Sequence, residues 1–305
     1  LDGRTEVTIP SGATEAIAAS LLALIAPGDE VLLFEPLYDA YLPLVQRAGG
    51  VARFARLEPP EWKITEEMLA RSFSPRTKAI VFNTPGNPNG RVYGANELAL
   101  LADYCVRHDA IAVCDEVWEH VTFDGVGHKS LLAAPGMRER CVKIGSAGKM
   151  FALTGWKVGF VCAAPRLSAV VAKAHQFLTF TTPPNLQRAV AYGLGKPQAD
   201  FAASRAEFQR SRDRLAGNLR AAGYTVVDSA GTYFLAIDLK ASGLTCDDET
   251  FCRRAIEEAG VASIPFSAFY AEDPVRHLVR LCFSKTDQTL DEGAARLARA
   301  RSLFL

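Results

Sequence analysis

The sequence has no excess of charge of either sign, no long apolar run and no recognisable leader. Lysine plus arginine and aspartate plus glutamate are equal at 34 each, so no basic surplus points to nucleic acid or to an acidic membrane. No uninterrupted apolar run is long enough to span a bilayer, and the opening LDGRTEVTIP lacks the basic and apolar regions of a signal peptide. These absences predict a soluble cytoplasmic protein with neither a nucleic acid nor a membrane as its partner.

Metal-ligating and disulfide patterns are also missing. The seven cysteines form no C-x-x-C pair, and none of the five histidines pairs with a cysteine at ligand spacing. Most of the cysteines lie in apolar stretches, which is typical of buried free thiols in a reducing compartment. We therefore expect no metal site.

Strand and helix patterns alternate through the first half of the chain, and the second half differs. Apolar runs such as EVLLFEP, KAIVFN, AIAVCDEV and CVKIGS alternate with helical segments, which indicates a mostly parallel sheet flanked by helices. After about Pro165 come long helical segments, and then mixed strands and helices. The 305 residues, 49% of them hydrophobic, can bury two cores. The sequence predicts a large α/β domain over 1–185 and a smaller α+β domain over 186–305, connected by one long helix near 187–217.

Polar residues follow several predicted strands, where open α/β sheets bind their ligands. Gly12-Ala13-Thr14 opens a helix, whose free N–H groups form either a phosphate site or an ordinary helix start. Asp115 ends a buried strand and needs a partner there, either a cationic ring nitrogen or a structural arginine. Tyr38 follows another strand, and it either lies on a ligand ring or packs in the core.

Lys149 lies between small residues in SAGKMFALTGWKVGF, residues 146–160. Small neighbours let a bulky group approach its amine, and a desolvated amine can form a Schiff base. The alternative is a surface lysine beside a buried strand. Asn87 lies in the loop NTPGNPNG, which on its own is also typical of a Pro/Gly turn.

Taken in this order, the motifs resemble those of the fold type I pyridoxal-phosphate enzymes, specifically the class I/II aminotransferases. The resemblance covers essentially the whole chain and is strongest in NTPGNPNG, VCDEV, SAGKMFALTGWKVGF and HLVRLCFSK. It implies a fold type I architecture, the cofactor pyridoxal 5'-phosphate and a homodimer. The implied reaction is ping-pong transfer of an amino group between an L-amino acid and a 2-oxo acid.

The resemblance also implies roles for single residues. Lys149 matches the lysine that forms the Schiff base and moves the substrate proton, and Asp115 matches the carboxylate that keeps the ring nitrogen protonated. Arg280 matches the arginine that clamps the substrate α-carboxylate, with Asn87 and Tyr38 beside the substrate. Tyr38 also matches the aromatic ring that stacks on the cofactor, and Asn87 matches the donor to its phenolate oxygen. The residues that match the phosphate-binding site are Gly12, Ala13, Thr14, Ser146 and Lys157.

Two cofactor contacts and the start of the chain depart from the family pattern. Trp118 stands where the family usually has tyrosine, and an indole can donate but cannot accept or ionise comparably, so we expect altered tuning of the cofactor. Lys157 stands where many relatives have arginine, and it binds phosphate as a point charge. Relatives carry a further N-terminal stretch, and the opening Leu1 favours a fragment or a missing start over a truncated protein.

Within the family, EPLYDAYLP and DSAGTYFLAIDL look most like the succinyldiaminopimelate and kynurenine/glutamine aminotransferase branch. We favour an N-succinyl-LL-diaminopimelate:2-oxoglutarate aminotransferase of lysine biosynthesis. The alternatives are a kynurenine, glutamine or methionine type of aminotransferase, a cysteine-conjugate β-lyase, or a non-catalytic regulator that keeps the fold. The expected pocket residues Tyr233 and Phe234 do not distinguish a long acidic side chain from an aromatic one.

Overall fold

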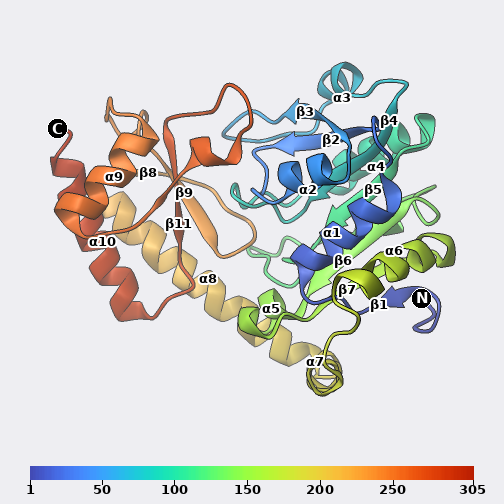
Figure 1. Cartoon of the computed structure of the whole chain (residues 1–305). Helices are drawn as coiled ribbons and strands as arrows, with labels where there is room; N and C mark the ends of the chain where they lie inside the picture. The colour runs from blue at the N-terminus through green and yellow to red at the C-terminus, as the bar shows by residue number, and fades with distance from the viewer.

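A seven-stranded sheet forms the centre of the larger of two bodies in the computed structural model, which describes residues 1–305 (Figure 1). The strand order is β1-β7-β6-β5-β4-β2-β3. Strands β2 to β6 are parallel to one another, whereas β7 runs antiparallel to both β6 and β1. The bounds are Val7–Thr8 (β1), Glu30–Glu35 (β2), Val51–Arg56 (β3), Thr77–Asn83 (β4), Ile111–Asp115 (β5), Cys141–Ser146 (β6) and Gly159–Ala163 (β7). The predicted mostly parallel sheet is confirmed.

Helices cover both faces of this sheet, because its strands are apolar on both sides. Along β2, Leu33 packs in the core beneath one helical layer, whereas Leu32 packs in the core of the opposite face. The first layer contains α1 (Ala13–Leu24) and α6 (Pro165–Leu178), and the second contains α3 (Glu66–Ser72) and α4 (Ala95–Arg107). Thr65 caps α3, since its hydroxyl accepts from the Met68 N–H at 3.2 Å.

A four-stranded antiparallel sheet, in the order β10-β11-β9-β8, forms the smaller body. Its elements are β8 (Thr225–Val227), β9 (Phe234–Asp238), β10 (Ile264–Pro265) and β11 (Leu278–Cys282), with α9 (Asp248–Ala259) and α10 (Asp287–Ser302). Leu235 and Leu281 of this sheet belong to the same buried cluster as Leu33 of the large sheet. The two bodies therefore share a continuous apolar core.

The connection between the bodies differs from the single helix expected near 187–217. The chain forms α7 (Pro184–Leu194) and then, after a break, α8 (Gln198–Ala221), which runs beneath both bodies in Figure 1. Pro197 lacks an N–H group and disfavours helical geometry at the residue before it, so one helix cannot continue through this point. The expectation of one helix is therefore wrong, and the predicted boundary between 185 and 186 stays a prediction.

Two short helices complete the large body, α2 (Tyr41–Arg47) and α5 (Ala147–Met150). Each follows a strand of the large sheet, and α5 carries Lys149 directly after β6. None of the helices combines the length and the apolar character that crossing a membrane would require.

Candidate active site

A cavity of about 640 Å³ lies where the carboxyl ends of β4, β5 and β6 meet the small sheet. All the residues that the sequence predicts to contact the cofactor or the substrate line this cavity, except Tyr233. The volume is in the usual range for a small-molecule site. Residues far apart in the sequence are thus brought together as expected, while the role of each one stays a prediction.

One end of the cavity is suited to an anion. Helix α1 begins after Gly12, whose φ is 85°, and no side chain caps its first turn, so the N–H groups of Ala13 and Thr14 are left for a ligand. Ser146 and Lys157 line the same end. A Cβ on Gly159 would lie 2.8 Å from the carbonyl carbon of Gly12, so glycine is what allows β7 to approach the start of α1.

The cavity also contains a buried carboxylate. Asp115 is 5% exposed at the end of β5, and its Oδ2 accepts from the Tyr41 hydroxyl at 2.6 Å. Its Oδ1 accepts from the Val117 N–H at 3.3 Å. Burial raises the pKa of Asp115, although these two hydrogen bonds and the charge of Lys149 act in the opposite direction. A cation that entered the cavity beside Asp115 would therefore be strongly stabilised.

We expect the Asp115→Asn variant of the cofactor-free protein to unfold at a higher temperature than the wild type at neutral pH, by about 2 °C. Because the pKa of Asp115 is raised in the folded state, the stability it contributes is present at low pH and is lost as the pH rises through that pKa. The asparagine carries no buried charge and can still accept from Tyr41. Thermal unfolding of both proteins over a pH series should show the advantage shrinking on acidification. A variant less stable than the wild type at neutral pH would contradict this account.

Lys149 extends from the single turn of α5 toward the other body. Its Nζ donates to the hydroxyl of Tyr233 at 3.1 Å and lies 4.9 Å from the centre of the Trp118 ring. Trp118 is 2% exposed and meets Tyr233 edge to face, with ring centres 4.3 Å apart. The amine therefore lies between aromatic groups, and its one side-chain hydrogen bond comes from the small body.

Arg280 on β11 is the cation that the small sheet presents to the cavity. Its Nη1 donates to Asn87 Oδ1 at 2.6 Å, and the guanidinium lies 4.0 Å from the ring centre of Phe234 and 4.7 Å from that of Phe269. It makes no salt bridge with any carboxylate of the chain, and burial lowers its pKa. A planar cation held between two aromatic rings without an acidic partner is suited to receive a carboxylate.

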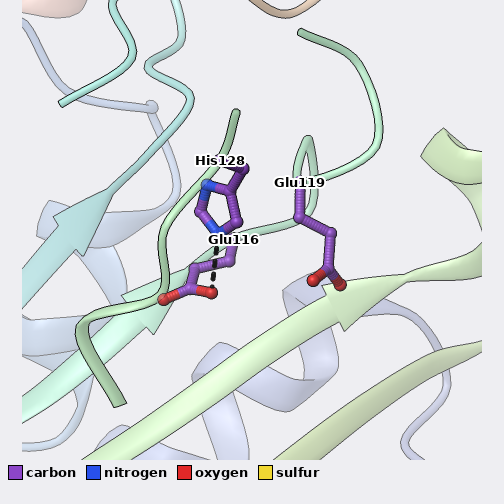
Figure 2. A group of neighbouring side chains, drawn as sticks. All are labelled: Glu116, Glu119 and His128. Carbon is purple, nitrogen blue, oxygen red and sulfur yellow. Dashed lines mark hydrogen bonds and ion pairs between the residues drawn. The ribbon is translucent and has the colours of Figure 1, made fainter. Parts of the chain in front are cut away.

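A second group of ionisable side chains lies behind β5, outside the cavity. Figure 2 shows His128 joined to Glu116, at 2.9 Å, with the Glu119 carboxylate beside them. The sequence spacing did not single out this group, and its ligand atoms all lie within 4.8 Å of one another. Lys143 already occupies it, with Nζ 2.5 Å from Glu119 and 4.0 Å from Glu116. We therefore interpret the group as a structural ion-pair network.

Sequence reasoning missed two contacts that tyrosine hydroxyls make at the site. The contact from Tyr41 to Asp115 was not anticipated, although Tyr41 follows Tyr38 by three residues and their rings lie 5.5 Å apart. Tyr233 was expected in the pocket as a substrate neighbour, and its hydrogen bond to Lys149 was not. The spacing of Tyr38 and Tyr41 was a usable signal, whereas nothing in the sequence brings residue 233 to residue 149.

Known proteins match this chain over almost its whole length. A family model described as "Aminotransferase class I and II" matches residues 1–297. The probable N-succinyldiaminopimelate aminotransferase of Mycobacterium tuberculosis (strain H37Rv) is 43% identical over 97% of this chain and 77% of its own length. The methionine aminotransferase of Escherichia coli (strain K12) is 39% identical over 97% of this chain and 76% of its own.

A solved structure of the N-succinyldiaminopimelate aminotransferase from Mycobacterium tuberculosis superposes with a TM-score of 0.94 at 44% identity. The match covers 98% of this chain and 78% of that one. Both bodies therefore share their fold with a known aminotransferase structure.

Proposed function

Since this chain belongs to the class I and II aminotransferases and is a pyridoxal-phosphate-dependent enzyme, we propose that it transfers the amino group of N-succinyl-LL-diaminopimelate to 2-oxoglutarate. The similarity to the Mycobacterium tuberculosis enzyme supports this amino donor. The carrying observation is Arg280, a half-buried cation in the cavity with no carboxylate partner in the chain. An α-carboxylate of a substrate would supply the missing charge.

The residues of the cavity fit pyridoxal phosphate. The uncapped start of α1 and Lys157 offer N–H groups and positive charge to the phosphate. Gly159 permits this arrangement, since any side chain there would collide with Gly12. Asp115 offers a buried anion to the ring nitrogen, and Lys149 offers an amine to the carbonyl carbon.

When bound, pyridoxal phosphate supplies an electron sink that allows the bonds at the substrate Cα to break. The side chains of the protein hold and move the reacting groups. Arg280 binds the α-carboxylate with two parallel N–H groups and so fixes the direction of the Cα–H bond. Lys149 Nζ, once free, takes the α-proton as a general base. Asp115 would keep the ring nitrogen of the cofactor protonated, because the buried carboxylate has no other cation in hydrogen-bond contact.

A second candidate donor is an amino acid with an apolar side chain, such as methionine or kynurenine. The observation in its favour is the cavity wall, which includes Ile17, Tyr38 and Phe234. The cations of the cavity are Lys149, Lys157 and Arg280, and each already has a proposed partner. The distal carboxylates of a long acidic donor would have to be bound outside these three groups.

A panel of amino donors distinguishes these candidates. N-succinyl-LL-diaminopimelate, methionine, kynurenine and glutamine are compared by kcat/KM with 2-oxoglutarate as acceptor. We expect the succinylated donor to give the highest value, and a higher value for any other donor would overturn the proposed substrate. Pyruvate released from a cysteine conjugate without an oxo acid would instead indicate a β-lyase.

We also propose that two copies of the chain associate through the surface around α7. Large apolar side chains are exposed there, among them Phe177 at 86%, Phe180 at 75% and Tyr192 at 71%. A hollow of about 620 Å³ is lined by Tyr192 and Trp156. This surface lies at the edge of the large body, away from the small one (Figure 1). Several large apolar side chains exposed in one part of the chain are typical of an interface between subunits.

We expect light scattering to give the wild-type protein twice the 33.0 kDa mass of one chain. Replacing both Phe177 and Phe180 by glutamate should give a monomer, because charge is then buried in an apolar contact. The matched control is Ile256→Glu, which changes a 52%-exposed residue on α9 of the small body and should leave the dimer intact. A monomeric wild type would refute the proposal.

The seven free cysteines support a cytoplasmic location. Five of them are buried, and the Cys141 thiol donates to the Cys114 sulfur at 3.6 Å. Buried free thiols are typical of proteins in a reducing compartment.

A further inference from the structure

The hydroxyl of Tyr233 is the side-chain partner of the Lys149 amine, and it comes from the other body of the protein. The two atoms lie 3.1 Å apart, and Lys149 has no salt bridge to any acidic residue. Tyr233 directly precedes β9, and its carbonyl oxygen accepts from the Phe283 N–H at 3.0 Å. The hydroxyl is thus anchored through the small sheet and not through the lysine's own helical turn.

Trp118 explains why this hydroxyl is needed. Its ring centre is 4.9 Å from the Lys149 Nζ, but an indole has one N–H donor and no oxygen that could accept from an amine. The edge-to-face contact of Trp118 and Tyr233, 4.3 Å between ring centres, fixes the phenol ring. The acceptor for the amine is therefore supplied by Tyr233.

We propose that Tyr233 is a positioning residue of the transamination reaction, which holds the free amine of Lys149 for transfer of the α-proton. A lysine side chain has many rotamers, and a fixed acceptor removes most of them before the reaction. Tyr233 itself neither gains nor loses a proton. The inference rests on the proposed role of Lys149 as the base.

The small sheet also holds Tyr233 and Arg280 in a fixed position relative to each other. Strand β11, which carries Arg280, pairs with β9, and Cys282 lies opposite Phe234, the neighbour of Tyr233. One sheet therefore carries both the proposed clamp for the substrate carboxylate and the group that holds the base. This arrangement fixes the distance between the Cα–H bond and the amine, on which proton transfer depends.

The test is Tyr233→Phe, which keeps the ring contact with Trp118 and removes only the hydroxyl. We expect kcat of the amino-acid half-reaction to fall about 10- to 100-fold, the range for losing a hydrogen bond to a charged group, with KM changed by no more than about twofold. The deuterium isotope effect with an α-deuterated donor should rise, because proton transfer becomes slower relative to the other steps. The melting temperature should stay within about 2 °C of the wild type.

A second readout uses the cofactor-free protein. Cyanate carbamoylates amines, and peptide mass spectrometry gives the rate at Lys149 relative to Lys157 in the same sample. We expect this ratio to rise about threefold or more in Tyr233→Phe, because an amine that has lost its acceptor is more often free to react. The matched control is Tyr224→Phe, which removes a small-body hydroxyl that donates to the Leu297 carbonyl at 2.8 Å. It should change neither the ratio nor the isotope effect.

Three outcomes decide the proposal. A lower kcat with a higher isotope effect and labelling ratio supports it. Unchanged values in Tyr233→Phe overturn it, and so does a lower kcat without change in the isotope effect and labelling ratio, since the hydroxyl is then merely structural. Turnover that survives in Lys149→Ala removes the role of Lys149 itself, whereas an unchanged Tyr233→Phe beside an inactive Lys149→Ala removes only the role of Tyr233.

Discussion

Replacing Lys149 by alanine is expected to slow the amino-acid half-reaction by about four orders of magnitude, because the variant loses both its nucleophile and its base. The cofactor should still bind, since the start of α1, Lys157 and Asp115 are unchanged. Single-turnover absorbance of the bound cofactor after mixing with the amino donor measures the rate. Methylamine added in solution should restore part of it by entering the space that the lysine side chain leaves.

A matched control for this variant is Lys173→Ala, which removes an exposed lysine from α6. Its rate and cofactor content should equal those of the wild type. A Lys149→Ala protein that keeps turning over the donor would show that the base has been assigned to the wrong residue.

Exchanging Arg280 for lysine should raise KM for the amino donor about 100-fold while kcat falls less. The charge is kept, but the planar fork that matches a carboxylate and lies between Phe234 and Phe269 is lost. The variant should also discriminate less between the amino acid and the corresponding amine without the α-carboxylate. Steady-state kinetics with both compounds measure this ratio.

The control for Arg280→Lys is Arg276→Lys, in the segment just before β11. Arg276 is half-exposed and its Nη1 lies 3.5 Å from Glu249 Oε1. Neither residue lines the cavity. Its replacement should leave both KM values unchanged. An unaltered KM in Arg280→Lys would mean that the substrate carboxylate is bound elsewhere.

Local chemistry explains why much of the fold could be predicted from the sequence. Thr65 caps α3 through its own hydroxyl, and the apolar run of β2 requires helices on both faces, so neither feature depends on distant residues. The helix break at Pro197 could also have been predicted from the sequence, but the residues on both sides of it favour a helix and led to the prediction of a single one. A proline within a helical pattern should have ended the predicted helix.

Contacts between the bodies could not be predicted in the same way. The hydrogen bonds from Lys149 to Tyr233 and from Arg280 to Asn87 join residues separated by 84 and 193 positions. Their geometry depends on how the shared core orients one sheet against the other, which no local pattern specifies. Likewise, the proximity of Glu119 to Lys143 depends on how the turn after β5 lies over β6.

The division of the site between two sheets bears on how such a protein can diverge. The groups proposed for the cofactor lie on the large body, whereas Phe234 and Arg280 lie on β9 and β11. Mutations in the small sheet can thus alter substrate preference in a lineage while the cofactor contacts are inherited unchanged. Tyr233 is the exception, because drift at that position would disturb the lysine of the other body. Selection should therefore tolerate new residues along β9 more readily than at the tyrosine that precedes it.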